Sequence, residues 1–587
     1  MKDYRILRKF SYWRQKGDNN YYVFVFASVI VGIFTGFGAV ILKNSVHYMH
    51  ELLIPHRNSV VFVFFIFPFF GLFLTYLYIK IFKLDIKPGI YNLLYSTSSN
   101  NGYMKPHNVF SSIIGSVLTV GFGASGGLES PNMSTGGGIA SIVSKFFKLP
   151  YRQRIILIGV ATAGTISAIF KAPVTGIIFA LEVIMIDLTT LSIIPIVLAS
   201  VSASLTSYLF LGSNIIYNLR VDTIFMMNEV PYYIILGVAT GFFALFFSTM
   251  YLNLKRFFNK IKRRIYRFLI AGVVVGTFVY LFPAIFAEGY AALNSAIIGD
   301  YSYLFENSLF ENFDKSMGMI ILFFLLIAVA KAFATSVTVS AGGIGGFFTP
   351  ILFSGANIGL FMSHIFQKSK INISHETSAL VAMAGLISAM MHAPLSSVFF
   401  ISELTGKFSL LIPLLISSST SYITVKIFHK HNFLVTELAQ RKILLTHHAD
   451  RNILTILNLE TLIEKNFQTL TPDKNLGDLV EIVKVATRDL FPIVDCENNF
   501  LGVISLNRIR KIMFKEELYQ KTSVTELMIF PSTFVELDEH LETVAEKFEK
   551  TERFNLLVLD KGKYVGFLSR SHFFSQYRKL LREFSSD

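Results

Sequence analysis

The sequence predicts a polytopic α-helical membrane protein that carries a soluble α/β domain at its C-terminal end. The 587-residue chain is 52% hydrophobic and only 16% charged. Residues 21–42 and 59–79 contain no charged side chain, and each run is long enough to cross a hydrocarbon core about 30 Å thick. Downstream of residue 440, charged residues recur every few positions, so no segment there can span a bilayer.

These changes in composition divide the chain. We expect a basic N-terminal segment over residues 1–20, a membrane domain over 21–440, a linker over 441–465 and the soluble domain over 466–587. The basic residues of the first segment place it in the cytoplasm by the positive-inside rule, and the soluble domain with it. No cleavage pattern follows the first apolar run, so we expect a multi-pass protein of the plasma (cell inner) membrane, with an organelle membrane as the alternative.

Charge and cysteine content narrow the function classes. The net charge of +14 fits basic cytoplasmic flanks in contact with anionic lipids, and no recognition motif indicates nucleic-acid binding. The single cysteine, Cys496, excludes an internal disulfide, and His447 and His448 lack the spacing of a zinc site. No nucleophile elbow and no phosphate-loop lysine is present, so we expect no catalytic residue, no metal and no enzyme.

The membrane domain contains an internal repeat. Residues 167–173 and 388–394 both contain Ser-Ala and Ala-Pro, and Glu182 and Glu403 follow them at the same spacing. We therefore expect two halves, at about 21–215 and 230–440. The shorter apolar runs within them are broken by Gly, Pro and Ser, which predicts helices that end inside the membrane beside a substrate path.

A glycine-rich loop recurs in each half at nearly the same offset. Residues 126–131 (Gly-Gly-Leu-Glu-Ser-Pro) correspond to residues 345–350 (Gly-Gly-Phe-Phe-Thr-Pro). In an inverted repeat the helices that follow these loops would begin near one point, and helix N-termini attract anions. Glu129 places a carboxylate in the first loop, where an unpaired charge is costly. We expect this carboxylate to gate an anion site.

The soluble domain also repeats. Residues 491–505 and 556–569 each form an apolar strand, a polar turn and a second strand that contains glycine, and a helical stretch follows each. We expect two copies, at about 466–520 and 523–582, that pack together as one module.

Because of the two glycine-rich loops and the matched Ala-Pro segments, the chain resembles the CLC family of chloride channels and chloride/proton antiporters. Its soluble C-terminal domain resembles a pair of CBS domains. The likeness extends from about residue 20 to residue 585. The resemblance implies tilted, broken helices in two inverted halves, assembled as a homodimer with one pore in each subunit.

The resemblance also assigns roles to individual residues. It makes Glu129 the external gating glutamate. The first filter segment of the family, G-S-G-I-P, corresponds to residues 87–91. Backbone amides in the two glycine loops would hold the outer and the central anion. The implied anion-binding residues are Leu128, Glu129, Ser130, Phe347 and Phe348 in these loops, with Pro88, Gly89 and Ile90 in the first filter segment.

Two departures from the family pattern concern selectivity. Pro88 replaces the serine whose hydroxyl contacts the central anion, and its loss should weaken chloride dehydration at that site. A proline there accompanies nitrate preference in plant relatives, so a nitrate-preferring transporter is an alternative. Leu434 stands where the family has a pore tyrosine, so the inner constriction is expected to be more open.

A third departure concerns protons. Antiporters of the family usually carry an inner glutamate, and Val183 aligns with that position. We therefore expect a gated chloride channel that conducts passively, with Glu182 as a structural carboxylate. A chloride/proton antiporter is the alternative, and in that case Glu182 becomes a candidate proton acceptor. A membrane anchor for a nucleotide-sensing CBS module is a third hypothesis from a different class.

The resemblance leaves room for an adenine nucleotide at the CBS pair. Family members that bind one commonly place an aspartate three residues after a Ser or Thr. Arg508 and His572 occupy these positions here. We therefore expect no resident cofactor and favour a structural, dimer-stabilising role for the module.

Overall fold

The chain folds into two compact units, Met1–Leu444 and Leu445–Asp587. The structure is a computed structural model. It describes residues 19–57, 62–99, 102–184, 190–212, 225–306, 308–311, 316–368, 373–429, 432–434, 459–539, 541–551 and 553–585. The predicted N-terminal basic segment, most of the predicted linker, and the pair His447 and His448 lie outside the described residues.

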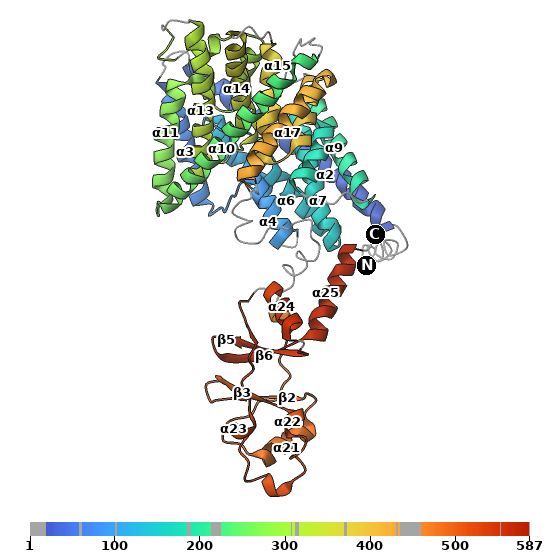
Figure 1. Cartoon of the computed structure of the whole chain (residues 1–587). Coiled ribbons are helices and arrows are strands. Elements are labelled where there is room, and N and C mark those ends of the chain that lie inside the picture. The colour runs from blue at the N-terminus through green and yellow to red at the C-terminus, as the bar shows by residue number, and fades with distance from the viewer. Residues whose placement is uncertain are drawn as a thin grey trace, which may run out of the picture. The chain divides into compact units, whose positions relative to one another are not determined.

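The first unit is a bundle of tilted helices (Figure 1). Within the described residues, nine helices are long and apolar enough to cross a membrane. They are α2 (Asn19–Arg57), α3 (Val63–Ile81), α7 (Tyr151–Phe170), α9 (Thr190–Leu211), α10 (Val230–Lys260), α11 (Arg264–Leu281), α13 (Met317–Ala341), α14 (Phe348–Lys368) and α17 (Leu411–Phe428).

Shorter helices lie between these spans, as the interrupted apolar runs predict. Several begin at a glycine-rich loop or directly at a proline, where no helical partner exists for the first amides. They are α4 (Gly89–Ser99), α5 (Asn108–Ser116), η1 (Val117–Gly121), α6 (Glu129–Phe146), α8 (Pro173–Val183), α12 (Tyr290–Ile297), α15 (His375–Met391) and α16 (Pro394–Thr405).

The predicted duplication is confirmed by matching contacts in the two halves. Helix α2 packs on α9 and α7, and its counterpart α10 packs on α17 and α15. The repeated Ala-Pro segments also share a backbone conformation: Lys171 and His392 cap α7 and α15 in the left-handed region, both with φ of 56°. Each helix ends at such a turn because the proline that starts the next helix cannot continue it.

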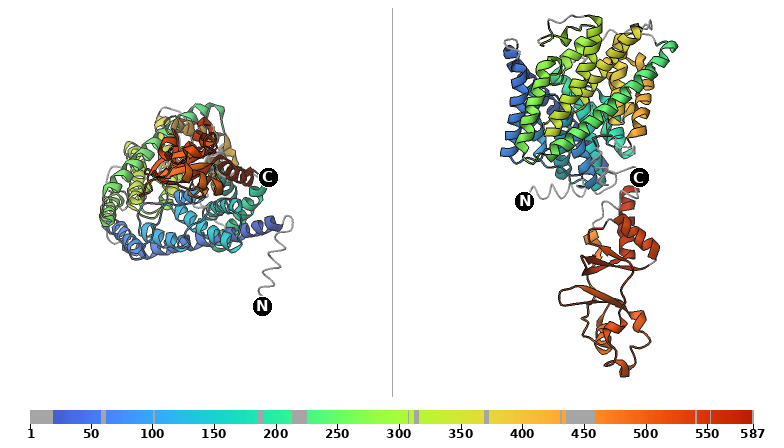
Figure 2. Two further views of the ribbon diagram at one scale, coloured as in Figure 1. Left: turned by 90° about the horizontal axis from the view of Figure 1, so that it is seen from below. Right: turned by 60° about the vertical axis from the view of Figure 1, so that its left-hand side comes forward.

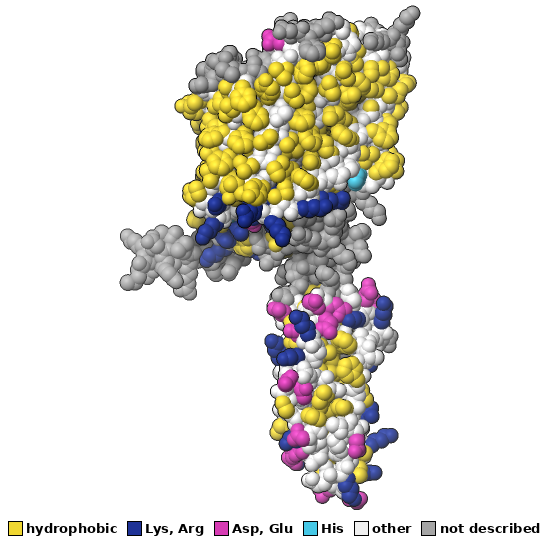
Figure 3. All heavy atoms as spheres, turned by 90° about the vertical axis from the view of Figure 1, so that its left-hand side faces the viewer, with side chains coloured by type: hydrophobic (Ala, Val, Ile, Leu, Met, Phe, Trp, Pro, Cys, Tyr) yellow, Lys and Arg dark blue, Asp and Glu magenta, His cyan; other side chains and the backbone are white. Residues whose placement is uncertain are grey.

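The outer surface of this unit suits a bilayer. A broad apolar face ends at a band of basic side chains at one end of the unit (Figure 3). Exposed Lys260, Lys262, Arg263 and Arg264 stand together where α10 ends and α11 begins. Such a band is typical of the cytoplasmic rim of a membrane protein.

The second unit is the predicted two-copy α/β module, and its two small sheets follow one another along its length (Figure 2). One sheet has strand order β1-β6-β5-β4, and the other pairs β2 with β3. The strands are β1 (Ile463–Glu464), β2 (Leu490–Val494), β3 (Phe500–Ser505), β4 (Phe534–Glu536), β5 (Asn555–Asp560) and β6 (Lys563–Ser569). The helices are α20 (Leu459–Leu462), α21 (Leu476–Val485), α22 (Leu506–Ile509), η6 (Glu516–Leu518), α23 (Val524–Leu527), α24 (Leu541–Thr551) and α25 (Arg570–Ser585).

The two copies join through their hairpin turns. The Phe500 amide donates to the Gly562 carbonyl at 3.0 Å, and the Tyr564 amide donates to the Asn498 carbonyl at 3.0 Å. Both turns contain the left-handed residues that tight hairpins need, Asn498 and Gly562 among them. Strand β1 pairs with β6, so the ordered module begins within the range that composition alone assigns to the linker.

Candidate anion site

The two glycine-rich loops meet, as the repeat predicts. The Gly127 amide donates to the Gly346 carbonyl at 2.9 Å, and the Gly346 amide donates to the Gly127 carbonyl at 2.7 Å. Helix α6 begins two residues after Gly127, and α14 begins two residues after Gly346. The positive ends of two helix dipoles therefore lie next to one point inside the membrane unit.

The Glu129 side chain fills that point. It is 3% exposed, and its Oε1 accepts a hydrogen bond from the Phe348 amide at 2.7 Å. The Thr349 hydroxyl donates to Oε2 at 3.3 Å. A Cβ atom at Gly127 or Gly346 would overlap this carboxylate, so the two glycines leave room for it in this position. The carboxylate thus occupies the position that a free anion would take at the start of α14.

A small cavity of about 20 Å³ lies beside the carboxylate and brings together most of the predicted site. Its predicted members are Pro88, Ile90, Glu129, Ser130, Phe347, Phe348 and Leu434. Met133 and Met391 also line it and were missed by sequence reasoning. Met391 stands directly before His392 in the repeated segment, and Met133 follows Glu129 by one helical turn, so spacing offered a signal for both.

Two predicted anion-binding residues lie outside this cavity. Gly89 starts α4, and its amide donates to the Ser130 hydroxyl oxygen at 2.8 Å, which joins the first filter segment to the gating loop. Leu128 packs its side chain into a separate apolar cluster with Leu42 and Val46. Only the backbone of Leu128 remains available for an anion.

The Leu434 segment is fixed against the second glycine loop. The Leu434 amide donates to Asn432 Oδ1 at 2.9 Å, and Asn432 Nδ2 donates to the Met391 carbonyl at 3.1 Å. The Phe433 ring packs edge-on against Phe347, with centroids 5.1 Å apart. These contacts place an apolar side chain, Leu434, at the cavity wall.

Glu182 and Glu403 form reciprocal caps between the halves. Glu182 accepts from the Leu395 and Ser396 amides at 3.2 and 2.8 Å, at the start of α16. Glu403 accepts from the Val174 and Thr175 amides at 2.9 and 2.7 Å, at the start of α8. This is the structural role expected from the sequence, since each carboxylate satisfies amides that a helix start leaves unpaired.

Val183, next to Glu182, is 4% exposed and packs in the apolar core. It does not reach the cavity beside Glu129.

A second set of charged residues lies beyond the gating loop, and sequence reasoning missed most of it. The Lys331 ammonium group is fully buried and donates to the Ile285 and Ala287 carbonyls at 3.0 and 2.6 Å, so it is an internally paired lysine. Glu288 follows Ala287 and interacts electrostatically with Lys43 and Lys331. A charged residue directly after an apolar segment was the available signal for Glu288.

The metal sites and the CBS residues considered from the sequence can also be located in the structure. Within the described parts of the chain, no group of three or more His, Cys, Asp or Glu side chains is arranged to hold a metal ion. Arg508 lies in α22 and His572 in α25, where the His572 amide donates to the Ser569 hydroxyl oxygen at 3.4 Å.

The fold and the site define a duplicated helical membrane protein with a buried carboxylate where two helices begin side by side. A sequence model of the voltage gated chloride channel family matches residues 70–426, and CBS domains match residues 459–515 and 524–579. The chain therefore belongs to the CLC family and carries a C-terminal CBS pair.

Named relatives extend this assignment. The chain is 23% identical to an H⁺/Cl⁻ exchange transporter, ClcA of Vibrio cholerae, over 52% of this chain and 63% of that protein. Two crystal structures share the fold, each with a TM-score of 0.61. A slow cyanobacterial Cl⁻/H⁺ antiporter matches 72% of this chain and 98% of its own at 20% identity. A eukaryotic CLC transporter matches 94% of this chain and 98% of its own at 16% identity.

Proposed function

We propose that this protein exchanges chloride for protons and that Glu129 couples the two ions. One observation carries the proposal: the Glu129 carboxylate accepts from the Phe348 amide at 2.7 Å, in the place of an anion. An ionised carboxylate and a chloride ion cannot occupy this place together. Protonation removes the charge that holds Glu129 at the helix start, so the side chain leaves and chloride enters. Each exchange of anion for carboxylate is thereby linked to a proton.

The relatives favour exchange over the passive conduction that the sequence led us to expect. ClcA and the cyanobacterial protein are both named as proton-coupled antiporters. The expectation of a channel rested on Val183 alone. A missing inner carboxylate removes one proton entry, but a chain of water molecules can replace it.

A passive, Glu129-gated anion channel is the second candidate, and Val183 supports it. Val183 is apolar and buried, and its neighbour Glu182 is engaged in capping α16. If neither side chain accepts protons from the inner side, protonation of Glu129 would open an anion path without driving proton transport.

Liposomes that contain the purified protein distinguish the two candidates. Under an imposed chloride gradient, we expect protons to move against their own gradient at a fixed ratio to chloride. Chloride flux without coupled proton movement would identify the channel instead. No anion flux would revive the hypothesis of a membrane-anchored CBS sensor.

The Glu129→Gln variant tests the role of the carboxylate itself. Glutamine keeps the shape of the side chain but cannot be ionised, so proton transport should fall to the leak of empty liposomes while chloride flux continues. The control is Glu481→Gln, because Glu481 is an exposed carboxylate paired with Lys484 in the CBS module. Proton coupling that survives Glu129→Gln would contradict the proposed coupling.

The proposal also covers assembly and orientation in the membrane. We propose the homodimer that the family resemblance implies, with one pathway in each subunit. The basic end of the membrane unit is proposed to face the cytoplasm. The CBS pair is proposed to act structurally, because Arg508 and His572 replace the residues expected to hold a ribose.

A further inference from the structure

The buried position of Glu129 leaves the source of its proton to be explained. The carboxylate is 3% exposed, and the adjoining cavity of about 20 Å³ is lined mainly by apolar side chains, including Ile90, Met391 and Leu434. Apolar walls do not transfer protons. A route from the outer solution must therefore reach the carboxylate from another direction.

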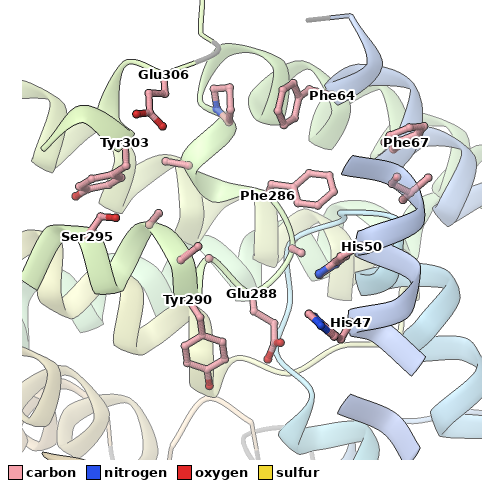
Figure 4. Close-up of a pocket in the computed structure, with 17 residues that line it drawn as sticks. His47, His50, Phe64, Phe67, Phe286, Glu288, Tyr290, Ser295, Tyr303 and Glu306 are labelled. Atoms are coloured by element: carbon pink, nitrogen blue, oxygen red, sulfur yellow. The ribbon is translucent and has the colours of Figure 1, made fainter. Parts of the chain in front are cut away.

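A larger cavity lies on the other side of the gating loop. Its volume is about 370 Å³, and it is bordered by α2, α3 and the segment from Pro283 to Glu306. His47 and His50 face it from α2, and the side chains of Glu288 and of Tyr290, the first residue of α12, extend in the same direction (Figure 4). The basic residues within 260–264 stand at the start of α11 and the cavity-lining Pro283 follows its end, so we place the cavity at the opposite end of the unit.

Two hydroxyl groups connect this cavity with the gate. Tyr290 Oη lies 3.1 Å from Thr349 Oγ1. Thr349 Oγ1 in turn donates to Glu129 Oε2 at 3.3 Å. Because the threonine hydrogen is directed to the carboxylate, the tyrosine must donate to the threonine oxygen. The chain thus begins at a cavity-lining residue and ends on the acceptor.

The backbone holds this chain in place. The Ala287 amide donates to the Gly123 carbonyl at 3.1 Å, and the Gly126 amide donates to the Ala287 carbonyl at 3.4 Å. Lys331 also donates to the Ala287 carbonyl, at 2.6 Å. The segment that carries Glu288 and Tyr290 is therefore fixed directly to the gating loop.

We propose that Tyr290 and Thr349 relay protons from the outer cavity to Glu129 while its carboxylate is bound at the start of α14, with Glu288 as the carboxylate that exchanges protons with water in the cavity. This inference rests on the proposed function. In one transfer, Tyr290 Oη receives a proton from the cavity, the proton of Tyr290 passes to Thr349 Oγ1, and the proton of Thr349 passes to Glu129 Oε2. One O–H bond breaks and one forms at each hydroxyl, and one positive charge reaches the carboxylate. Rotation of both hydroxyls then restores the starting directions.

Other charged and titratable groups surround this route and will influence its pH dependence. Lys43 and Lys331 interact electrostatically with Glu288, and Glu288 interacts in the same way with Glu129. The remaining groups at the cavity are His47, His50, Tyr303 and Glu306.

The test compares hydroxyl deletions in reconstituted full-length protein. In Tyr290→Phe and Thr349→Val, the number of protons moved per chloride should fall about tenfold or more, because proton transfer loses a carrier. Thr349→Ser keeps the hydroxyl and should restore the ratio. The matched control is Tyr303→Phe, since Tyr303 lines the same cavity but donates to Asn357 Oδ1 at 2.9 Å. Its ratio should stay that of the wild type.

Three outcomes would overturn the relay. The first is a wild-type ratio in both Tyr290→Phe and Thr349→Val. The second is an equal loss in Tyr303→Phe. The third is a fall of chloride flux when Tyr290→Phe is added to Glu129→Gln. Residue 129 accepts no proton in that background, so such a fall would indicate altered packing.

The experiment separates the relay from the proposed exchange. If the wild type conducts chloride without protons, exchange is wrong, and the relay is then tested by steps of external pH. Tyr290→Phe should slow the rise of chloride flux after acidification about tenfold. An unchanged rise would overturn the relay in a channel as well.

Discussion

Pro88 lines the cavity beside Glu129 at the position where the family pattern has a serine, so it brings no hydroxyl donor there. Proline lacks both the hydroxyl of serine and an amide hydrogen. Ser130, which lines the same cavity, accepts from the Gly89 amide at 2.8 Å through its hydroxyl oxygen. We expect an anion in this cavity to find fewer donors than it would beside the serine of the family pattern, which would favour ions that lose water readily, such as nitrate.

Pro88→Ser should shift selectivity toward chloride. A new hydroxyl donor to a charged partner should raise the ratio of chloride to nitrate transport by about five- to tenfold. The ratio is measured by competition between the two anions in liposome uptake. Leu434→Tyr, which adds a hydroxyl from the neighbouring wall, serves as the comparison. An unchanged ratio in Pro88→Ser would show that this segment does not contact the ion.

Sequence reasoning worked best for residues that sit in repeated motifs. Glu129 and Phe348 were both expected at the site because their loops recur, and the structure places them in contact. Glu288 and Tyr290 were missed because nothing in their local sequence indicates which loop they touch. Their position depends on backbone pairing with a loop more than 150 residues earlier, between Ala287 and Gly123. The role of such residues becomes visible only in three dimensions.

At the scale of helices, the reciprocal caps tie α8 of one half to α16 of the other. Glu182 caps α16 and also receives the Ser396 hydroxyl at 2.6 Å, and Glu403 receives the Thr175 hydroxyl at 2.6 Å. The paired arrangement follows from the inverted repeat. It explains why both carboxylates occur at equivalent positions as helix caps.

Glu182→Ala and Glu403→Ala should therefore destabilise the membrane unit to a similar degree. Each leaves two helix-start amides and one hydroxyl without their acceptor, at a cost of about 1–3 kcal/mol. The measurement is the midpoint of thermal unfolding of purified protein in detergent. If Glu182→Ala abolished proton coupling while its unfolding midpoint stayed that of the wild type, Glu182 would be a proton acceptor and not a cap.

In the CBS module, the first hairpin depends on the Asp495 carboxylate. It accepts from the Asn499 amide at 2.7 Å, from Asn499 Nδ2 at 2.8 Å and from the Glu497 amide at 2.9 Å. These hydrogen bonds, led by those from Asn499, lower the pKa of Asp495 below its ordinary value. A lowered pKa means that the ionised form stabilises the folded hairpin. This contribution is complete above about pH 4, the ordinary pKa of an aspartate, and is lost as the pH falls through the lower, folded value.

Asp495→Asn should accelerate hydrogen exchange at the hairpin amides of the full-length protein at pH 7. The difference from the wild type should shrink as the pH falls through the lowered pKa of folded Asp495, because the wild-type carboxylate then becomes protonated too. Asp473→Asn is the control, since Asp473 also has a lowered pKa but lies outside the hairpin. Equal exchange rates at pH 7 in Asp495→Asn and the wild type would contradict this role.

For the whole molecule, the single cysteine offers a test of orientation. Cys496 is exposed in the CBS module and is the only cysteine of the chain. If the module lies in the cytoplasm, a membrane-impermeant maleimide should label intact cells only after permeabilisation. Glu306→Cys in a Cys496→Ser background, at the proposed outer cavity, should be labelled without permeabilisation. Labelling of Cys496 in intact cells would reverse the assigned orientation.

The meeting of Gly127 with Gly346 also bears on how such a chain arose by duplication. Glu129 and Phe348 hold the same place in the two copies, and the carboxylate of one binds the amide of the other. Had both copies kept a glutamate, two like charges would face each other at a single anion site. Only a chain whose two halves differ here can place a single carboxylate at this point. Because one copy has a glutamate and the other a phenylalanine, the protein has one carboxylate at this point and one backbone amide, that of Phe348, that binds it.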